Sequence, residues 1–118
     1  MNKIRVLKFG TSERLNKMLE FSLRGYECDI ITDLDEMNDL QDKRIIFALD
    51  LYDTGINVEF MKLLEKIRSA GPGFMKNSTG GILINSDNEL FTRGEARKTI
   101  FYANMAGCMF PGKTLSEA

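Results

Sequence analysis

Three short polar segments contain the residues best suited to hold a small ligand. The first, residues 10–16, carries two hydroxyl side chains and an amide just before a helical pattern. Hydroxyls and backbone N–H groups at the start of a helix suit a phosphate. The same residue types also cap helices without any ligand, and the two interpretations stay open. The candidate phosphate ligands of this segment are Thr11, Ser12 and Asn16.

The second and third segments, residues 50–57 and 85–88, each follow an apolar run. Residues 50–57 combine an aromatic side chain, a glycine and short polar groups, so Tyr52 or the backbone could lie against a planar ring. An ordinary loop capped by Asn57 would have the same composition. Residues 85–88 are polar and turn-prone, and a plain turn is their simpler interpretation. The candidate ring-binding residues are Tyr52, Thr54, Gly55, Ser86 and Asp87.

Composition excludes several kinds of chemistry. The 118 residues include no histidine, which removes imidazole metal sites and catalysis by Ser–His or Cys–His pairs. Two cysteines, Cys28 and Cys108, are too few for a disulfide framework or a cysteine-rich zinc site. They are expected to be reduced thiols that pack as small hydrophobic side chains. No metal site and no catalytic side chain are therefore predicted.

The overall balance of residues predicts one folded domain, residues 1–118, in the cytoplasm. Hydrophobic residues make up 43% of the chain and charged residues 28%, as in ordinary globular proteins. Sixteen Lys and Arg against seventeen Asp and Glu leave a net charge of -1, which argues against nucleic-acid binding. Residues 1–10 contain no apolar run long enough for a signal peptide or a membrane span.

Apolar runs separated by turn residues predict alternating strands and helices. Short apolar, β-branched runs predict the strands, which we place at residues 4–9, 26–32, 44–49, 80–84 and 108–110. Helical spacing and cap residues predict the helices. The first begins at Thr11 or Ser12, a short second one at Asp33, the third runs from Val58 to about Ser69, and the fourth begins at Thr92.

This order predicts an α/β fold with a doubly wound parallel sheet of strand order 2-1-3-4-5. In such sheets ligands bind outside the carboxyl ends of the strands, where the three polar segments should meet. The fifth strand is short, and only residues 113–118 follow Pro111 and Gly112, which leaves no room for a last covering helix. An uncovered face favours association with another chain, and a homodimer is the expected form.

Residues 50–57, Asp-Leu-Tyr-Asp-Thr-Gly-Ile-Asn, resemble a loop of the flavodoxin-like NAD(P)H-dependent FMN reductases that contacts the flavin ring. Residues 103–118 are similar to the end of the fifth strand in some flavodoxin-like proteins. The resemblance implies a flavodoxin-like fold and an FMN cofactor, with NAD(P)H as a possible co-substrate. The partners would be the flavin and a small-molecule electron donor or acceptor.

Two other functions remain open for the same fold. The segment around Asp50 also resembles the phospho-acceptor strand of response-regulator receiver domains, with Ser86 and Lys113 in place of that family's hydroxyl and lysine. A receiver needs an acidic pair after the first strand to hold Mg²⁺, and Lys8 lies there instead, which leaves only a degenerate receiver. The other alternative is an interaction or dimerisation module without a ligand.

Overall fold

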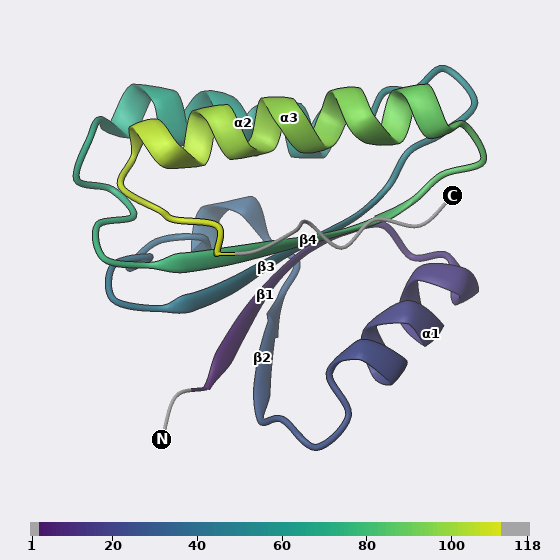
Figure 1. Cartoon of the computed structure of the whole chain (residues 1–118), viewed down its shortest axis with the longest axis horizontal. Helices are drawn as coiled ribbons and strands as arrows, with labels where there is room; N and C mark the ends of the chain where they lie inside the picture. The colour runs from purple at the N-terminus through teal and green to yellow at the C-terminus, as the bar shows by residue number, and fades with distance from the viewer. Residues whose placement is uncertain (1–2, 112–118) are drawn as a thin grey trace.

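Residues 3–111 are described by a computed structural model, and a four-stranded parallel sheet forms their centre (Figure 1). The strand order is β2-β1-β3-β4, which reproduces the predicted order without its fifth strand. The elements in chain order are β1 (Ile4–Phe9), α1 (Glu13–Ser22), β2 (Cys28–Ile31), the 3₁₀ turn η1 (Leu34–Glu36), β3 (Arg44–Asp50), α2 (Val58–Ala70), β4 (Thr79–Asn85) and α3 (Glu89–Met105).

Helices cover both faces of the sheet, but unequally. Helices α2 and α3 lie side by side on one face, and α1 lies alone on the other (Figure 1). The larger core cluster fills the α2–α3 side around Phe47 and Phe60, and a smaller one packs Leu15 and Leu19 of α1 onto the sheet. Because α1 packs over β3 and β4, Ile30 of the edge strand β2 stays 58% exposed.

The predicted fifth strand is wrong for residues 108–110, which form only an isolated bridge between Thr79 and Met109. Helix α3 ends in a Schellman motif, in which Gly107 takes a φ of 102° and the Cys108 N–H donates to the Ala103 carbonyl. Cys108 therefore stays tied to the helix. Pro111 has no N–H with which to continue the ladder, so pairing is limited to Met109.

Two helix predictions also differ from the structure. Helix α3 begins at Glu89, three residues before Thr92, because the Asn88 side chain accepts hydrogen bonds from the Leu90 and Phe91 amides. The helix predicted from Asp33 is only the 3₁₀ turn η1. Asp33 caps it as predicted, but the backbone leaves the helical region at Met37, which has a ψ of 69° and is buried in the core, and Asp39 then takes a left-handed φ of 53°.

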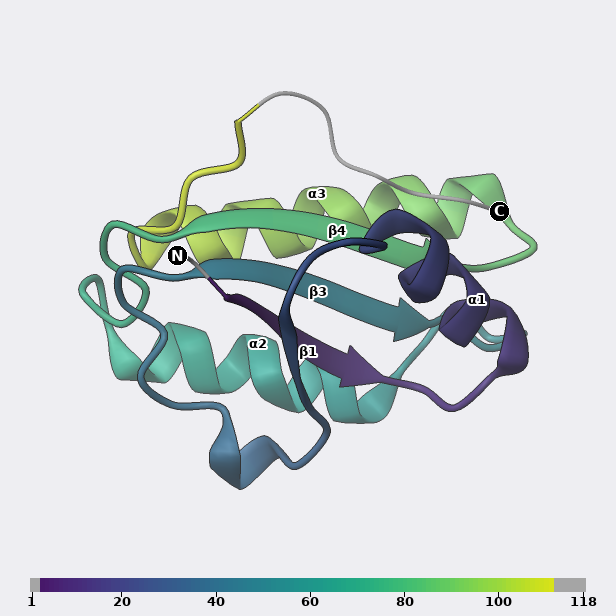
Figure 2. The ribbon, with the colours of Figure 1, turned by 90° about the horizontal axis from the view of Figure 1, so that it is seen from below.

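The other predicted elements agree closely with the structure. Strand β1 has its predicted bounds, β3 extends to Asp50 and β4 runs from Thr79 to Asn85, whereas β2 is shorter than the predicted residues 26–32 and covers Cys28–Ile31. All strands run the same way, so the loops after β1, β3 and β4 gather at one end of the sheet (Figure 2). Those loops contain all the predicted ligand-binding residues except Asn16, which lies in α1. Within residues 3–111 no helix has the length and apolar character needed to cross a membrane.

Candidate functional site

The carboxylate of Asp50 is the centre of a closed polar junction at the carboxyl end of the sheet. Asp50 is the last residue of β3 and is only 4% exposed. Its Oδ2 accepts a hydrogen bond of 3.1 Å from the Ser12 backbone N–H, and its Oδ1 accepts one of 2.6 Å from the Ser12 hydroxyl. Asn85, its register partner on β4, donates Nδ2 to the same Oδ1 at 2.8 Å. The junction thus ties β3, β4 and the start of α1 together.

Ser12 contributes to the junction and caps α1 at the same time. Its Oγ accepts a hydrogen bond of 3.0 Å from the Leu15 amide, the usual N-cap contact. The predicted capping role of Ser12 is therefore confirmed. Because its N–H and hydroxyl proton are both directed at Asp50, neither is offered outward to a phosphate.

Asn57 closes the interior beneath this junction. Its Nδ2 donates to the backbone carbonyls of Phe9, at 2.9 Å, and Asp50, at 2.8 Å, where β1 and β3 end. Its Oδ1 accepts from the Phe60 amide at 3.1 Å, which makes it the N-cap of α2. One buried side chain therefore joins two strand ends to a helix, and the predicted cap at Asn57 is confirmed.

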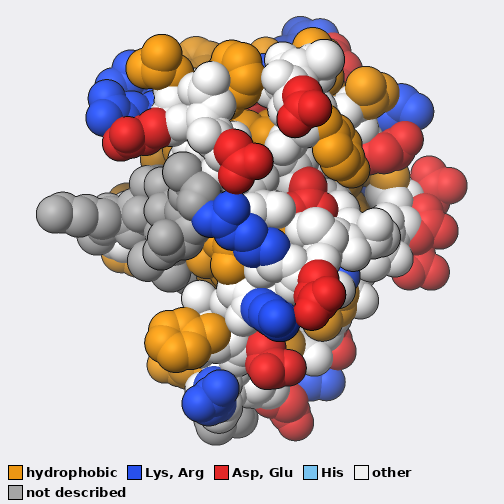
Figure 3. Space-filling view, turned by 90° about the vertical axis from the view of Figure 1, so that its right-hand side faces the viewer, with side chains coloured by type: hydrophobic (Ala, Val, Ile, Leu, Met, Phe, Trp, Pro, Cys, Tyr) orange, Lys and Arg blue, Asp and Glu red, His pale blue; other side chains and the backbone are white. Residues whose placement is uncertain are grey.

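A second, open region lies beside the junction. The loops after β3 and β4 border a cavity of about 240 Å³, lined on one side by Tyr52 and Asp53 and on the other by Ser86, Asp87 and Phe91. Figure 3 views the molecule from this end and shows apolar side chains interspersed with acidic ones. Tyr52 is 57% exposed at the rim. We refer to these five residues as the aromatic rim.

Three of the eight predicted site residues, Tyr52, Ser86 and Asp87, come together in the aromatic rim. Ser86 forms a local turn through its hydroxyl with the backbone of Asn88, and Asp87 pairs with Arg14 at 3.3 Å. The turn interpretation of residues 85–88 is thus also correct.

The remaining predicted residues lie elsewhere. Gly55 sits under the Phe91 ring, which a Cβ at Gly55 would approach to 2.7 Å, so the ring covers this part of the loop. Thr11 and Thr54 are exposed and do not line the cavity. Asn16 faces a separate open groove of about 540 Å³ between α1 and the edge of the sheet. The sequence grouped Thr11, Ser12 and Asn16 as one phosphate site, but in the structure the Ser12 hydroxyl is bonded to Asp50 and Asn16 lines a different groove.

Sequence reasoning missed two members of this end of the molecule. Phe91 precedes the helix start predicted at Thr92, so no role was predicted for it; the cap residue Asn88 is the signal that would have put it in the first turn of α3. Asn85 was treated only as a turn residue. The pairing of Asp50 with Asn85 depends on strand register, for which the sequence offers no local signal.

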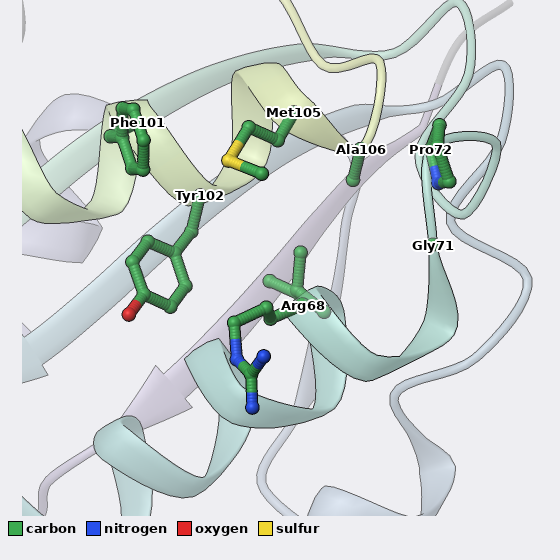
Figure 4. A pocket seen from close by; sticks show the side chains of 8 residues that line it. Arg68, Gly71, Pro72, Phe101, Tyr102, Met105 and Ala106 are labelled. Atoms are coloured by element: carbon green, nitrogen blue, oxygen red, sulfur yellow. The ribbon is translucent and has the colours of Figure 1, made fainter.

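Two further cavities lie outside this region. An apolar cavity of about 150 Å³ lies between the carboxyl-terminal ends of α2 and α3. Figure 4 shows how Arg68 of α2 lies near Tyr102 and Met105 of α3 there. This cavity is at the opposite end of the sheet from the junction and the aromatic rim. The groove beside Asn16 is larger, but only its Lys8 and Arg24 could attract an anion, and Glu20 lies between the same walls.

The two thiols have no activating environment. Burial raises the pKa of the Cys108 thiol to about 12. Burial, and next to it the negative charge of Asp29, raises the pKa of Cys28. A raised thiol pKa keeps the neutral, non-nucleophilic form at physiological pH. Cys108 is buried and packs as a small hydrophobic side chain, as predicted.

The junction also bears on the receiver alternative. Asp50 lies at the predicted position at the end of β3, but Ser12 and Asn85 enclose its carboxylate, which is therefore not presented to a phosphodonor. Across residues 3–111 no group of three or more acidic or thiol side chains lies close enough together to hold a metal ion. Lys113, the other residue of that resemblance, lies outside the described residues.

Sequence comparison with protein-family models and with curated proteins finds no match. The fold is similar to a short-chain flavodoxin associated with a non-canonical PDU bacterial microcompartment, with a TM-score of 0.69 and 13% identity over 98% of this chain and 84% of that one. It is equally similar to the TIGR4 flavodoxin of Streptococcus pneumonia, with a TM-score of 0.68 and 16% identity over 100% of this chain and 84% of that one. The chain has a flavodoxin-like fold.

Proposed function

We propose that the chain binds the ring of a flavin at the aromatic rim and serves in flavin electron transfer. The observation that carries this proposal is the cavity between the loops after β3 and β4, which two aromatic side chains, Tyr52 and Phe91, help to line. Both similar structures are flavodoxins, which supports a flavin as the ligand class.

The residues present fit the ring of FMN better than its phosphate. Tyr52 and Phe91 can contact the ring, while Ser86 and backbone groups of its loop border the same cavity. The β1–α1 loop, where the sequence placed the phosphate, directs Ser12 inward at Asp50. Asp53 and Asp87 add negative charge around the cavity. A phosphate dianion would face the carboxylates of Asp53 and of Asp87, which Arg14 pairs at 3.3 Å, and would find the Ser12 donors already used by Asp50, so the preferred flavin is an uncharged one such as riboflavin.

The flavin would supply the redox chemistry, since no side chain in the rim is suited to carry electrons. The chain's own residues would hold and orient the ring. Tyr52 and Phe91 would contact its faces, and their exposure would leave one edge open to a donor. The proposal includes the reductase activity that the resemblance implies. The electron donor would then be a nicotinamide, and NADH and NADPH are the two donors to compare.

Fluorescence titration with riboflavin and FMN tests the proposal. We expect quenching of riboflavin with a Kd in the micromolar range, roughly -7 to -8 kcal/mol, and at least about tenfold weaker binding of FMN at low salt. Exposed Tyr26, in the turn before β2, provides the matched control, because Tyr26→Ala should leave the titration unchanged whereas Tyr52→Ala should weaken it. Absence of quenching by either flavin would refute the function.

A ligand-free interaction module is the second candidate, and the surface around the rim favours it. Leu90, next to Phe91 in the chain, and Ile56, Val58 and Met61, in and after the loop that carries Tyr52, are largely exposed to solvent. Clustered exposed apolar groups are typical of protein contacts. If no flavin binds but substitutions of Leu90 abolish self-association, this second function replaces the first.

A further inference from the structure

We propose that Asp50 is a built-in anion that fills the anion position at the start of α1 and closes the β1–α1 loop to phosphorylated ligands. The inference stands whether or not a flavin ring binds at the aromatic rim. It concerns which ligands this loop excludes, and it assigns that exclusion to one side chain.

The contacts of Asp50 are those that an external anion would make. Ser12 is the N-cap residue of α1, and its N–H and hydroxyl both donate to the carboxylate, at 3.1 Å and 2.6 Å. Asn85 adds a third donor at 2.8 Å. Backbone and hydroxyl donors beside a positive helix end form the usual setting for a bound anion. Here the protein itself provides the negative group.

Gly10 makes room for this internal anion. It has a φ of 148°, and a Cβ built on it would lie 2.7 Å from the Asp50 carboxylate carbon. A side chain at position 10 would therefore displace the carboxylate. The last residue of β3 and the first residue after β1 are thus matched to each other across the sheet.

The consequence for ligands is both steric and electrostatic. The carboxylate accepts from all three donors and Asp50 as a residue is only 4% exposed, so a phosphate cannot reach these donors. A phosphate outside the loop would meet the negative charge of Asp50 and the carboxylate of Glu13 in the first turn of α1, which Lys17 pairs at 3.2 Å. The loop resembles a phosphate site in sequence but is closed in structure.

Chemical rescue with formate tests this inference directly. Asp50→Ala leaves three donors facing a space the size of a carboxylate, and formate matches the missing group. We expect formate to raise the Tm of this variant by roughly 5 °C relative to chloride at the same ionic strength, and to leave the wild type unchanged. If the variant is unfolded in chloride, the same comparison is made on its refolding yield.

Two other variants keep the result unambiguous. Asp50→Asn fills the space with an uncharged amide and should gain nothing from formate. Asn57→Ala, which removes a buried amide from the same end of the sheet, controls for general stabilisation by salt. Equal responses of Asp50→Ala and Asn57→Ala to formate would overturn the inference.

Inorganic phosphate provides the test on the ligand side. We expect phosphate to leave the Tm of the wild type at its value in chloride. Stabilisation of the wild type by phosphate, lost in Ser12→Ala, would show that the loop is open and would overturn the inference. A failure of riboflavin to bind would count only against the proposed function, because neither formate nor phosphate involves the aromatic rim.

Discussion

The closed junction and the aromatic rim lie at the same end of the same sheet, yet they differ in almost every physical respect. The junction consists of short polar side chains, Ser12, Asp50 and Asn85, whose donors and acceptors are directed at one another. The rim presents large side chains such as Tyr52 and Phe91 beside an open cavity. Position at the carboxyl end of a parallel sheet is therefore not enough to make a ligand site. A polar loop is available to a ligand only when the protein has not already satisfied its hydrogen bonds.

The largest effect is expected at Gly10, where an added side chain would collide with Asp50 and disrupt the closed junction. Gly10→Ala combines backbone strain with a clash against Asp50, and we expect a loss of about 4 kcal/mol of unfolding free energy. Gly25→Ala also has a positive φ but meets no atom within 4 Å, and should lose only about 1 kcal/mol. Urea denaturation measures both.

A double-variant cycle shows whether the Gly10 effect involves the carboxylate. In an Asp50→Ala background the penalty of Gly10→Ala should fall by about 2 kcal/mol, because the clashes with the carboxylate atoms are gone, while the backbone strain and the close approach to the Cβ of residue 50, at 2.9 Å, remain. Strictly additive effects of the two substitutions would mean that Gly10 and Asp50 are not matched as described.

The next largest effects are expected at the two asparagine N-caps, of which Asn57 is buried and Asn88 is exposed. Asn57→Ala removes the cap of α2 and leaves the carbonyls of Phe9 and Asp50 without their donor, so we expect a loss of about 3 kcal/mol. Asn88→Ala removes only the cap of α3 and should lose about 1 kcal/mol. Thermal and urea unfolding measure both losses. Equal losses of unfolding free energy for the two variants would show that the hydrogen bonds from Asn57 to the Phe9 and Asp50 carbonyls add no stability.

The rim is tested by affinity rather than stability. Tyr52→Ala should leave the unfolding free energy within about 0.5 kcal/mol, because the side chain is exposed. It should weaken riboflavin binding by about 2 kcal/mol, or about thirtyfold in Kd, through loss of stacking. An unchanged Kd would place the ring elsewhere and would leave the rim without its proposed role.

The smallest effect is expected for self-association, which stays a prediction. We expect light scattering to give a mass approaching twice the single-chain 13.4 kDa at high micromolar concentration, falling on dilution. Leu90→Ser should weaken this association by about 1 kcal/mol, or about fivefold. Phe21, equally exposed but on α1, is the control, and a larger effect of Phe21→Ser would move the contact away from the rim.

Local sequence determined most of the elements. The apolar runs of β1 and β3 and the helical spacing of α2 predict those elements to within about one residue, because burial requires apolar side chains at these periods. Cap residues with a free side-chain acceptor, Ser12 and Asn57, were recognisable from their positions. The parallel order of the first four strands also follows from the alternation of strands and helices.

Tertiary contacts decided what the polar end of the sheet can do. From the sequence, Thr11, Ser12 and Asn16 form one candidate phosphate site, since hydroxyl and amide groups suit either a cap or a ligand. Register between β3 and β4 brings Asn85 beside Asp50, and the missing side chain of Gly10 admits the carboxylate, so that Ser12 is used internally. Hydroxyl and amide side chains can bind a ligand or can form hydrogen bonds within the protein. Only the distances between distant parts of the chain determine which of these occurs.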